Sequence, residues 1–253
     1  MSLNNWSEIK MVSRSVVLLL LFVGISIVRA EESGTYDPTD SYKVTEIHGW
    51  KVYVQKRLYR EKKEVGKEAL AILENQLFKV TRAVPEEKLA KLKEVPIWVC
   101  DRKDGPIHYH PAKEWLVDNN YNPDKAKAVD ISRAENIIRS HRDQPWVMLH
   151  ELAHAYHDRV ISFEDERVIA AYETAKKSGK YETITKIQGS VGKHYALTNH
   201  KEYFAECTEA FFGCNDFFPY VRTELREFDP DVYHALVDIW GNDPIRNSNP
   251  NRK

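Results

Sequence analysis

The segment Pro145–Asp158 constrains the fold most strongly, because it reads PWVMLHELAHAYHD and contains an H-E-x-x-H motif. The histidines of the motif, His150 and His154, are four residues apart, so on an α-helix they share one face. That spacing lets both imidazoles bind one metal ion. Glu151 can flank the ion without binding it, and in zinc hydrolases of this pattern that glutamate takes a proton from metal-bound water.

Residues around the motif favour a buried helix. Asp143 is expected to cap the helix, and Pro145 suits a first turn, where a missing N–H costs nothing. The remaining positions are apolar on almost every face. Histidine and glutamate side chains in such a helix need partners, because unpaired polar groups in a dry interior cost several kcal/mol. A metal ion would satisfy both histidines, whereas a chance match with packed histidines is the alternative.

Composition limits the class of protein. The chain has 253 residues and a net charge of −1, which fits one sizeable globular domain or two small ones. No basic stretch indicates a nucleic-acid partner, and no acidic run indicates a disordered acidic tail. The sequence also contains neither a Gly-rich phosphate loop nor a G-x-S-x-G elbow.

Residues 1–30 have the pattern of a secretory signal peptide. Lys10 and Arg14 precede the uncharged run Ser15–Val28, and small residues allow cleavage after Ala30. The run is shorter than the ~20 residues of a spanning helix, so an uncleaved anchor is the alternative. Translation from Met11 would give a more compact signal. We therefore expect a secreted or periplasmic protein that meets a membrane only transiently, through this peptide.

The sequence has three cysteines, Cys100, Cys207 and Cys214. An exported chain could form one disulfide and keep one thiol, and the sequence does not specify the pair. Cys207 falls in an expected core helix, so a buried thiol is an equal alternative there. No Cys-x-x-Cys spacing occurs, so a thiolate metal site is not expected.

Periodicity predicts an α+β fold, in which one small sheet is covered by helices. We interpret residues 31–45 as a loose N-terminal arm, 46–241 as a single domain, and 242–253 as a disordered tail. Strands are expected at His48–Leu58, Pro96–Cys100, Ile107–Tyr109 and Ala128–Ile131, with a loop around Val117–Asp124. Further helices are expected at Lys62–Val84, Glu86–Val95, Glu164–Lys177, Lys201–Phe212, Tyr220–Glu227 and Asp231–Trp240.

Other histidines are weaker metal-site candidates. His108 and His110 would share one face of a strand, but packed or solvent-facing side chains are the preferred interpretation. His157 would lie on the same helix as His150 and His154, and three imidazoles from one helix would crowd a single metal ion. His194 and His200 could line a cleft, although surface positions are preferred for both.

A catalytic zinc site needs a third protein ligand from a neighbouring element. The helix expected at Lys201–Phe212, with Asn199 as its expected cap, reads KEYFAECTEAFF. It places Glu202, Glu206 and Glu209 on or near one face. Glutamates are rarely buried unpaired, so a cation beside this helix would account for at least one of them. A solvated face or an ordinary ion pair is the alternative for Glu206 and Glu209.

The string YALTNHKEYFAE at Tyr195–Glu206, taken with the H-E-x-x-H helix, resembles the active-site motifs of the anthrax lethal factor family. That family includes the Pro-Pro endopeptidases and consists of zinc metallopeptidases. The resemblance covers only Trp146–Asp158 and Tyr195–Phe212. The region His48–Ile138 matches nothing in the family, and the toxin's large recognition domains have no counterpart here.

The resemblance implies a zincin-like domain that binds one Zn²⁺ per chain, with three ligands: His150, His154 and Glu202. It further implies that Glu151 is the general base and that Tyr195 donates a hydrogen bond to the oxyanion. Glu206 would orient a zinc-bound histidine without binding zinc itself. The expected function is an exported zinc endopeptidase acting on a peptide or protein. The alternative is a non-catalytic zinc-containing domain that binds peptide or cell-wall material.

Overall fold

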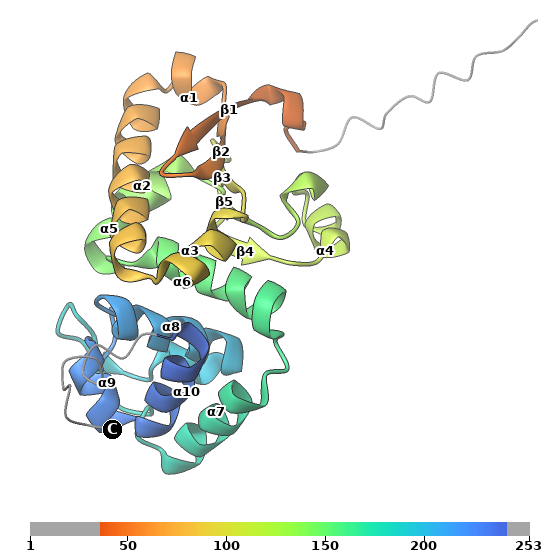
Figure 1. The fold of residues 1–253 in the computed structure, drawn as a ribbon. Helices are drawn as coiled ribbons and strands as arrows, with labels where there is room; N and C mark the ends of the chain where they lie inside the picture. The colour runs from red at the N-terminus through yellow and green to blue at the C-terminus, as the bar shows by residue number, and fades with distance from the viewer. Residues whose placement is uncertain (1–35, 242–253) are drawn as a thin grey trace, which may run out of the picture. The chain divides into compact units, whose positions relative to one another are not determined.

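The computed structural model describes residues 36–241. The expected signal peptide 1–30, the start of the expected arm and the expected tail 242–253 lie outside these described residues. The described chain has a mixed α+β fold, as the sequence predicts, with one five-stranded sheet and helices on either side of a central helix (Figure 1). Within residues 36–241, each helix is too short or too polar to cross a bilayer.

The main sheet has the strand order β1-β2-β3-β5-β4. Its central strands β2, β3 and β5 are parallel, and the edge strands β1 and β4 are antiparallel to their neighbours. The strand bounds are Tyr42–Ile47 for β1, Trp50–Gln55 for β2, Ile97–Val99 for β3, Ile107–His110 for β4 and Ala128–Ile131 for β5. The strands predicted near Pro96, Ile107 and Ala128 are therefore confirmed.

The first hairpin corrects two predictions. His48 and Gly49 both have positive φ, 50° and 91°, which is the conformation of a two-residue hairpin turn that suits the twist of paired strands. The strand expected from His48 therefore begins only at Trp50, and it ends at Gln55 before the short helix α1 (Arg57–Arg60). The loose arm expected to extend to residue 45 was also wrong, because β1 begins at Tyr42.

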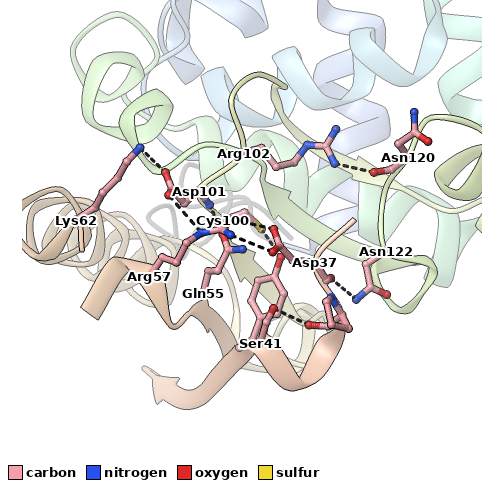
Figure 2. Close-up of polar contacts among 12 residues, drawn as sticks. Asp37, Ser41, Gln55, Arg57, Lys62, Cys100, Asp101, Arg102, Asn120 and Asn122 are labelled. Carbon is pink, nitrogen blue, oxygen red and sulfur yellow. Dashed lines mark hydrogen bonds and ion pairs between the residues drawn. The ribbon is translucent and has the colours of Figure 1, made fainter. Parts of the chain in front are cut away.

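Helices α2 (Lys63–Ala83) and α3 (Glu86–Lys93) lie where helical spacing predicts them. Helix α2 buries a stripe against the core that includes Ala69, Leu73, Leu77 and Val80. At the carboxyl ends of β2 and β3, polar contacts fasten α1 and the start of α2 to the sheet (Figure 2). There Gln55 accepts a hydrogen bond from the backbone of Asp101, and the Asp101 carboxylate pairs with Arg57 and Lys62.

Two short helices interrupt the region expected to be strands and loops. Helix α4 (Lys113–Asp118) occupies the start of the expected loop, and α5 (Ala134–Asp143) precedes the helix of the H-E-x-x-H motif. Asp143 is the last residue of α5, so it does not cap that helix as expected. Instead Trp146 precedes the first turn of α6 (Val147–Tyr156), and the side chain of Gln76 accepts a hydrogen bond from Met148 N–H.

Helix α6 passes between the sheet region and the C-terminal helices. It packs against α2, α3, β4 and β5 on one side and against α8 on the other. All ten of its residues are buried, which explains why its sequence is apolar on almost every face. After Tyr156 the helix widens into a π-helical turn at His157–Ile161.

The C-terminal part is mostly helical, as predicted. Asp165 caps α7 (Glu166–Ser178), and Gly179 ends it at a φ of 70°. A small hairpin of β6 (Ile184–Thr185) and β7 (Val191–Gly192) then leads to a 3-10 turn at Tyr195–Thr198. The last helices are α8 (His200–Phe212), α9 (Arg222–Phe228) and α10 (Pro230–Trp240).

Candidate metal centre

The structure brings three predicted ligand side chains together from two helices. His150 and His154 project from α6, and their Nε2 atoms are 3.1 Å apart. Glu202 projects from the first turn of α8, and its Oε2 lies 3.1 Å from His150 Nε2 and 3.2 Å from His154 Nε2. Three donor atoms from distant segments thus converge on one point, as both motifs together predict.

The start of α8 is fixed by a local interaction. The side-chain oxygen of Asn199 accepts hydrogen bonds from the backbone N–H groups of Lys201 and Glu202, at 2.9 and 3.0 Å. This N-cap holds Glu202 in the first helical turn, where the helix dipole also favours a carboxylate. The sequence expectation that Asn199 caps this helix is confirmed.

The close approach of α6 and α8 depends on a residue without a side chain. Gly213 follows α8, and a Cβ at this position would overlap the indole of Trp146, which precedes α6. The ammonium of Lys79 lies 4.9 Å from the centre of the same indole. The indole therefore packs directly on the backbone at the end of α8 and joins the start of one helix to the end of the other.

The donor set fits a zinc ion. Donors about 2.0–2.2 Å from a tetrahedral zinc ion lie roughly 3.3 Å from one another. The three ligand atoms of His150, His154 and Glu202 are separated by 3.1–3.2 Å. Two imidazoles and one carboxylate are also ligand types that zinc accepts, and a catalytic site leaves the fourth position open.

Electrostatics couple these side chains. Burial opposes a charge on His150, but hydrogen bonds to Glu202 and Glu209 outweigh burial and raise the pKa of the imidazole well above its ordinary value. Burial likewise acts to raise the pKa of Glu202, yet hydrogen bonds from His150 and His154 lower it far below the usual range. Glu202 is therefore ionised at neutral pH, as a metal ligand must be.

Glu151 lies beside the three convergent atoms rather than among them. Its side chain is buried, and Oε2 accepts a 2.7 Å hydrogen bond from the backbone N–H of Tyr109 in strand β4. Burial raises the pKa of the Glu151 carboxyl, although the two neighbouring histidines act in the opposite direction. A carboxylate with a raised pKa is suited to accept and then release a proton.

Tyr195 begins the 3-10 turn that precedes α8, and the residue is 47 % exposed, so its side chain is partly accessible to solvent. Partial burial raises the pKa of the phenol, and the charge of Glu202 raises it further. The phenol therefore keeps its proton at neutral pH and can donate a hydrogen bond.

The face of α8 below Glu202 carries two further buried glutamates. Glu209 Oε1 lies 2.8 Å from His150 Nδ1, whereas Glu206 Oε1 lies 3.7 Å from the same atom. Burial, followed by the charge of Glu209, raises the pKa values of both Glu206 and Asp216. The sequence places Glu209 on this face, but a solvated carboxylate or an ordinary ion pair was as good an interpretation as a role in the site. Spacing alone does not show which of the two carboxylates contacts the His150 ring.

A cavity of about 440 Å³ opens over the site. Its walls come from β4, α5, α6, α8 and the Tyr195 turn. The sequence did not indicate the α5 residues Asn136 and Ser140, or Gln144 just after the helix, because their polar pattern does not predict α5. The lining side chains of the motifs are His150, Glu151, His154, Tyr195, Glu202, Glu206 and Glu209.

The remaining candidate histidines contact other groups, and His194, for which a surface position was preferred, is instead buried and stacks on Phe217. His108 also lines the cavity, and its Nε2 lies 3.5 Å from Asp130 Oδ2, while His110 stacks on Trp115. His157 is fully buried next to aromatic rings, and His200 contacts the carbonyl oxygen of Phe163. All three cysteines are free thiols, so no disulfide joins them.

Comparison with protein-family models, with curated proteins and with solved structures finds no match for this chain. The resemblance to the lethal factor family therefore rests on the two motifs. The convergence of their side chains in space is an independent observation about this chain's own residues.

Proposed function

We propose that this chain is a zinc-dependent endopeptidase with a zincin-like domain, exported by its N-terminal signal. The observation that carries the proposal is the meeting of His150, His154 and Glu202 around one point, with Glu151 beside them. Two separate sequence motifs supply these groups, and both border one cavity. A zinc ion at this position would supply coordinated water with a pKa near 7 and would polarise a substrate carbonyl group.

Proton transfer and oxyanion stabilisation are assigned to two residues of the chain itself. Glu151 accepts the proton of the attacking water and passes it to the leaving amine, and the Tyr109 N–H keeps its carboxylate in place. The Tyr195 hydroxyl group donates a hydrogen bond to the oxyanion of the tetrahedral intermediate. Its exposure leaves it free to meet the substrate.

The cavity favours an extended polypeptide as substrate. Strand β4 is an edge strand of the sheet, and Pro106, Ile107, His108 and Tyr109 line the cavity. An extended peptide can add to such an edge through main-chain hydrogen bonds, which bind chains of varied sequence. The polar α5 side chains on another wall offer further hydrogen-bonding groups.

The proposal is tested with zinc-loaded protein and a degenerate peptide library read by mass spectrometry. We expect cleavage by the wild type, and a loss of at least about 100-fold in Glu151→Gln with zinc content unchanged. Undiminished cleavage by Glu151→Gln would remove the role of Glu151. A zinc-loaded wild type that cleaves no peptide would favour the binding-domain alternative, which requires neither Glu151 nor Tyr195.

A further inference from the structure

Helix α8 contacts both ring nitrogens of His150. Glu202 Oε2 lies 3.1 Å from Nε2, and Glu209 Oε1 lies 2.8 Å from Nδ1. Glu202 and Glu209 are seven residues apart, close to two helical turns, so both side chains leave the same face of α8. One helix therefore holds the imidazole between two carboxylates.

We propose that Glu209 is the positioning residue for His150 in the metal centre. Its carboxylate accepts a hydrogen bond from Nδ1–H, which fixes the tautomer and leaves the Nε2 lone pair for a metal ion bound between His150, His154 and Glu202. A metal-bound histidine commonly donates its second N–H to a carboxylate in this way, which orients the ring and increases its basicity. The inference rests on the proposed function, because it assumes that the site binds zinc.

The distances favour Glu209 over Glu206, the residue to which the family resemblance gives this role. Glu206 Oε1 is 3.7 Å from His150 Nδ1, and its Oε2 is 3.8 Å from His194 Nδ1, so both contacts exceed hydrogen-bond length. Of these two carboxylates, Glu209 is the one that approaches His150 Nδ1 closely enough to accept a hydrogen bond.

The surroundings of Glu209 also favour a role through His150. The carboxylate is 2 % exposed, and in residues 36–241 its only ion pair is with His150. A buried carboxylate without a lysine or arginine partner is costly for the fold, so stability alone does not explain its presence. A positioning role predicts that neutralising Glu209 changes the affinity and the geometry of the bound metal ion, whereas a purely structural role predicts a change in stability alone.

The test compares zinc affinity, by chelator competition, among wild type, Glu209→Gln, Glu206→Gln and Glu227→Gln. Glu227 is an exposed carboxylate of α9 and serves as the matched control. We expect Glu209→Gln to weaken zinc binding 10–100-fold, at least tenfold more than Glu206→Gln, with Glu227→Gln unchanged. The visible absorption of bound Co²⁺ should shift in Glu209→Gln and should stay as in the wild type in Glu206→Gln and Glu227→Gln.

Equal zinc affinities for Glu209→Gln and wild type would overturn the inference, as would a larger loss in Glu206→Gln. If Glu209→Gln does not fold, Glu209→Asp replaces it. Because Asp withdraws the carboxylate by one methylene, it should also weaken zinc binding, and wild-type affinity in Glu209→Asp would overturn the inference. A wild type that binds neither Zn²⁺ nor Co²⁺ would instead overturn the proposed function itself.

Discussion

The backbone N–H of Tyr109 donates a 2.7 Å hydrogen bond to Glu151 Oε2, which joins edge strand β4 to the helix that carries the candidate base. The Tyr109 side chain makes a second link, because its hydroxyl group donates a 2.6 Å hydrogen bond to Asp158 Oδ2 beyond the end of the same helix. The strand that we expect to bind substrate therefore also positions the carboxylate that we expect to move protons.

Replacing Asp158 by alanine tests the second link. The Tyr109 hydroxyl group loses a charged acceptor in a part-buried position, so we expect the free energy of unfolding to fall by about 1–3 kcal/mol. Zinc affinity should not change, because Asp158 contacts none of the three ligands. Urea denaturation and chelator titration of the same preparation measure both quantities, and a loss of zinc affinity with unchanged stability would contradict the expectation.

Removing the metal should lower the unfolding temperature. A ligand that binds only the folded state stabilises it by about 4 kcal/mol at 1,000 times its Kd, so the midpoint should rise with free zinc concentration. Scanning fluorimetry with and without a chelator measures this shift. Glu202→Gln removes one charged ligand and should reduce the shift, whereas Glu227→Gln should preserve it. Identical midpoints for the chelated and zinc-loaded wild type would contradict a zinc site.

Replacing Tyr195 by phenylalanine removes one hydroxyl group from an exposed ring. We expect kcat to fall about 10²–10³-fold, since losing one oxyanion donor typically costs about 3–4 kcal/mol. KM and zinc content should change little, because the hydroxyl group acts on charge that develops in the transition state. Steady-state kinetics on a peptide found by the library screen measure the effect. A variant with raised KM and unchanged kcat would indicate that Tyr195 binds substrate instead.

The sequence correctly predicts the parts of the fold in which a local residue pattern is sufficient to specify the secondary structure. The apolar stripe of α2 and the cap at Asn199 specify helices locally, and both lie where expected. Helix α5 was missed because only Ile137 and Ile138 stand out from its polar sequence, and Ile137 meets a core built by distant segments. The cap of α6 was missed because Gln76, which contributes to it, lies 72 residues earlier in the chain.

The contacts within the site also depend on tertiary structure that the sequence does not specify locally. Spacing places His150 and His154 on one face of their helix, and it places Glu202, Glu206 and Glu209 on one face of a second helix. The rotation of α8 against α6 then selects which carboxylate meets which ring nitrogen. That rotation depends on tertiary contacts such as Trp146 against Gly213, which no local pattern encodes.

The buried imidazole of His157 should make the fold sensitive to acid. It is fully buried, and neither ring nitrogen has a hydrogen-bond partner within the described chain. Burial lowers its pKa from 6.5 to about 3. Because the unfolded state binds this proton more readily, the contribution of His157 to stability is present above pH 6.5 and is lost as the pH falls from 6.5 toward 3.

Between pH 7 and pH 5 this difference in proton binding should lower the free energy of unfolding by about 2 kcal/mol. Urea denaturation with chelator present excludes the separate pH dependence of zinc binding. His157→Leu should lose less stability over this interval than the wild type, by about that amount. His234→Gln, at an exposed position, should behave as the wild type does. Equal pH dependence of the free energy of unfolding in His157→Leu and wild type would contradict this prediction. It would show that the native state accommodates the protonated imidazole or hydrogen-bonds it to water, and that other groups cause the acid sensitivity.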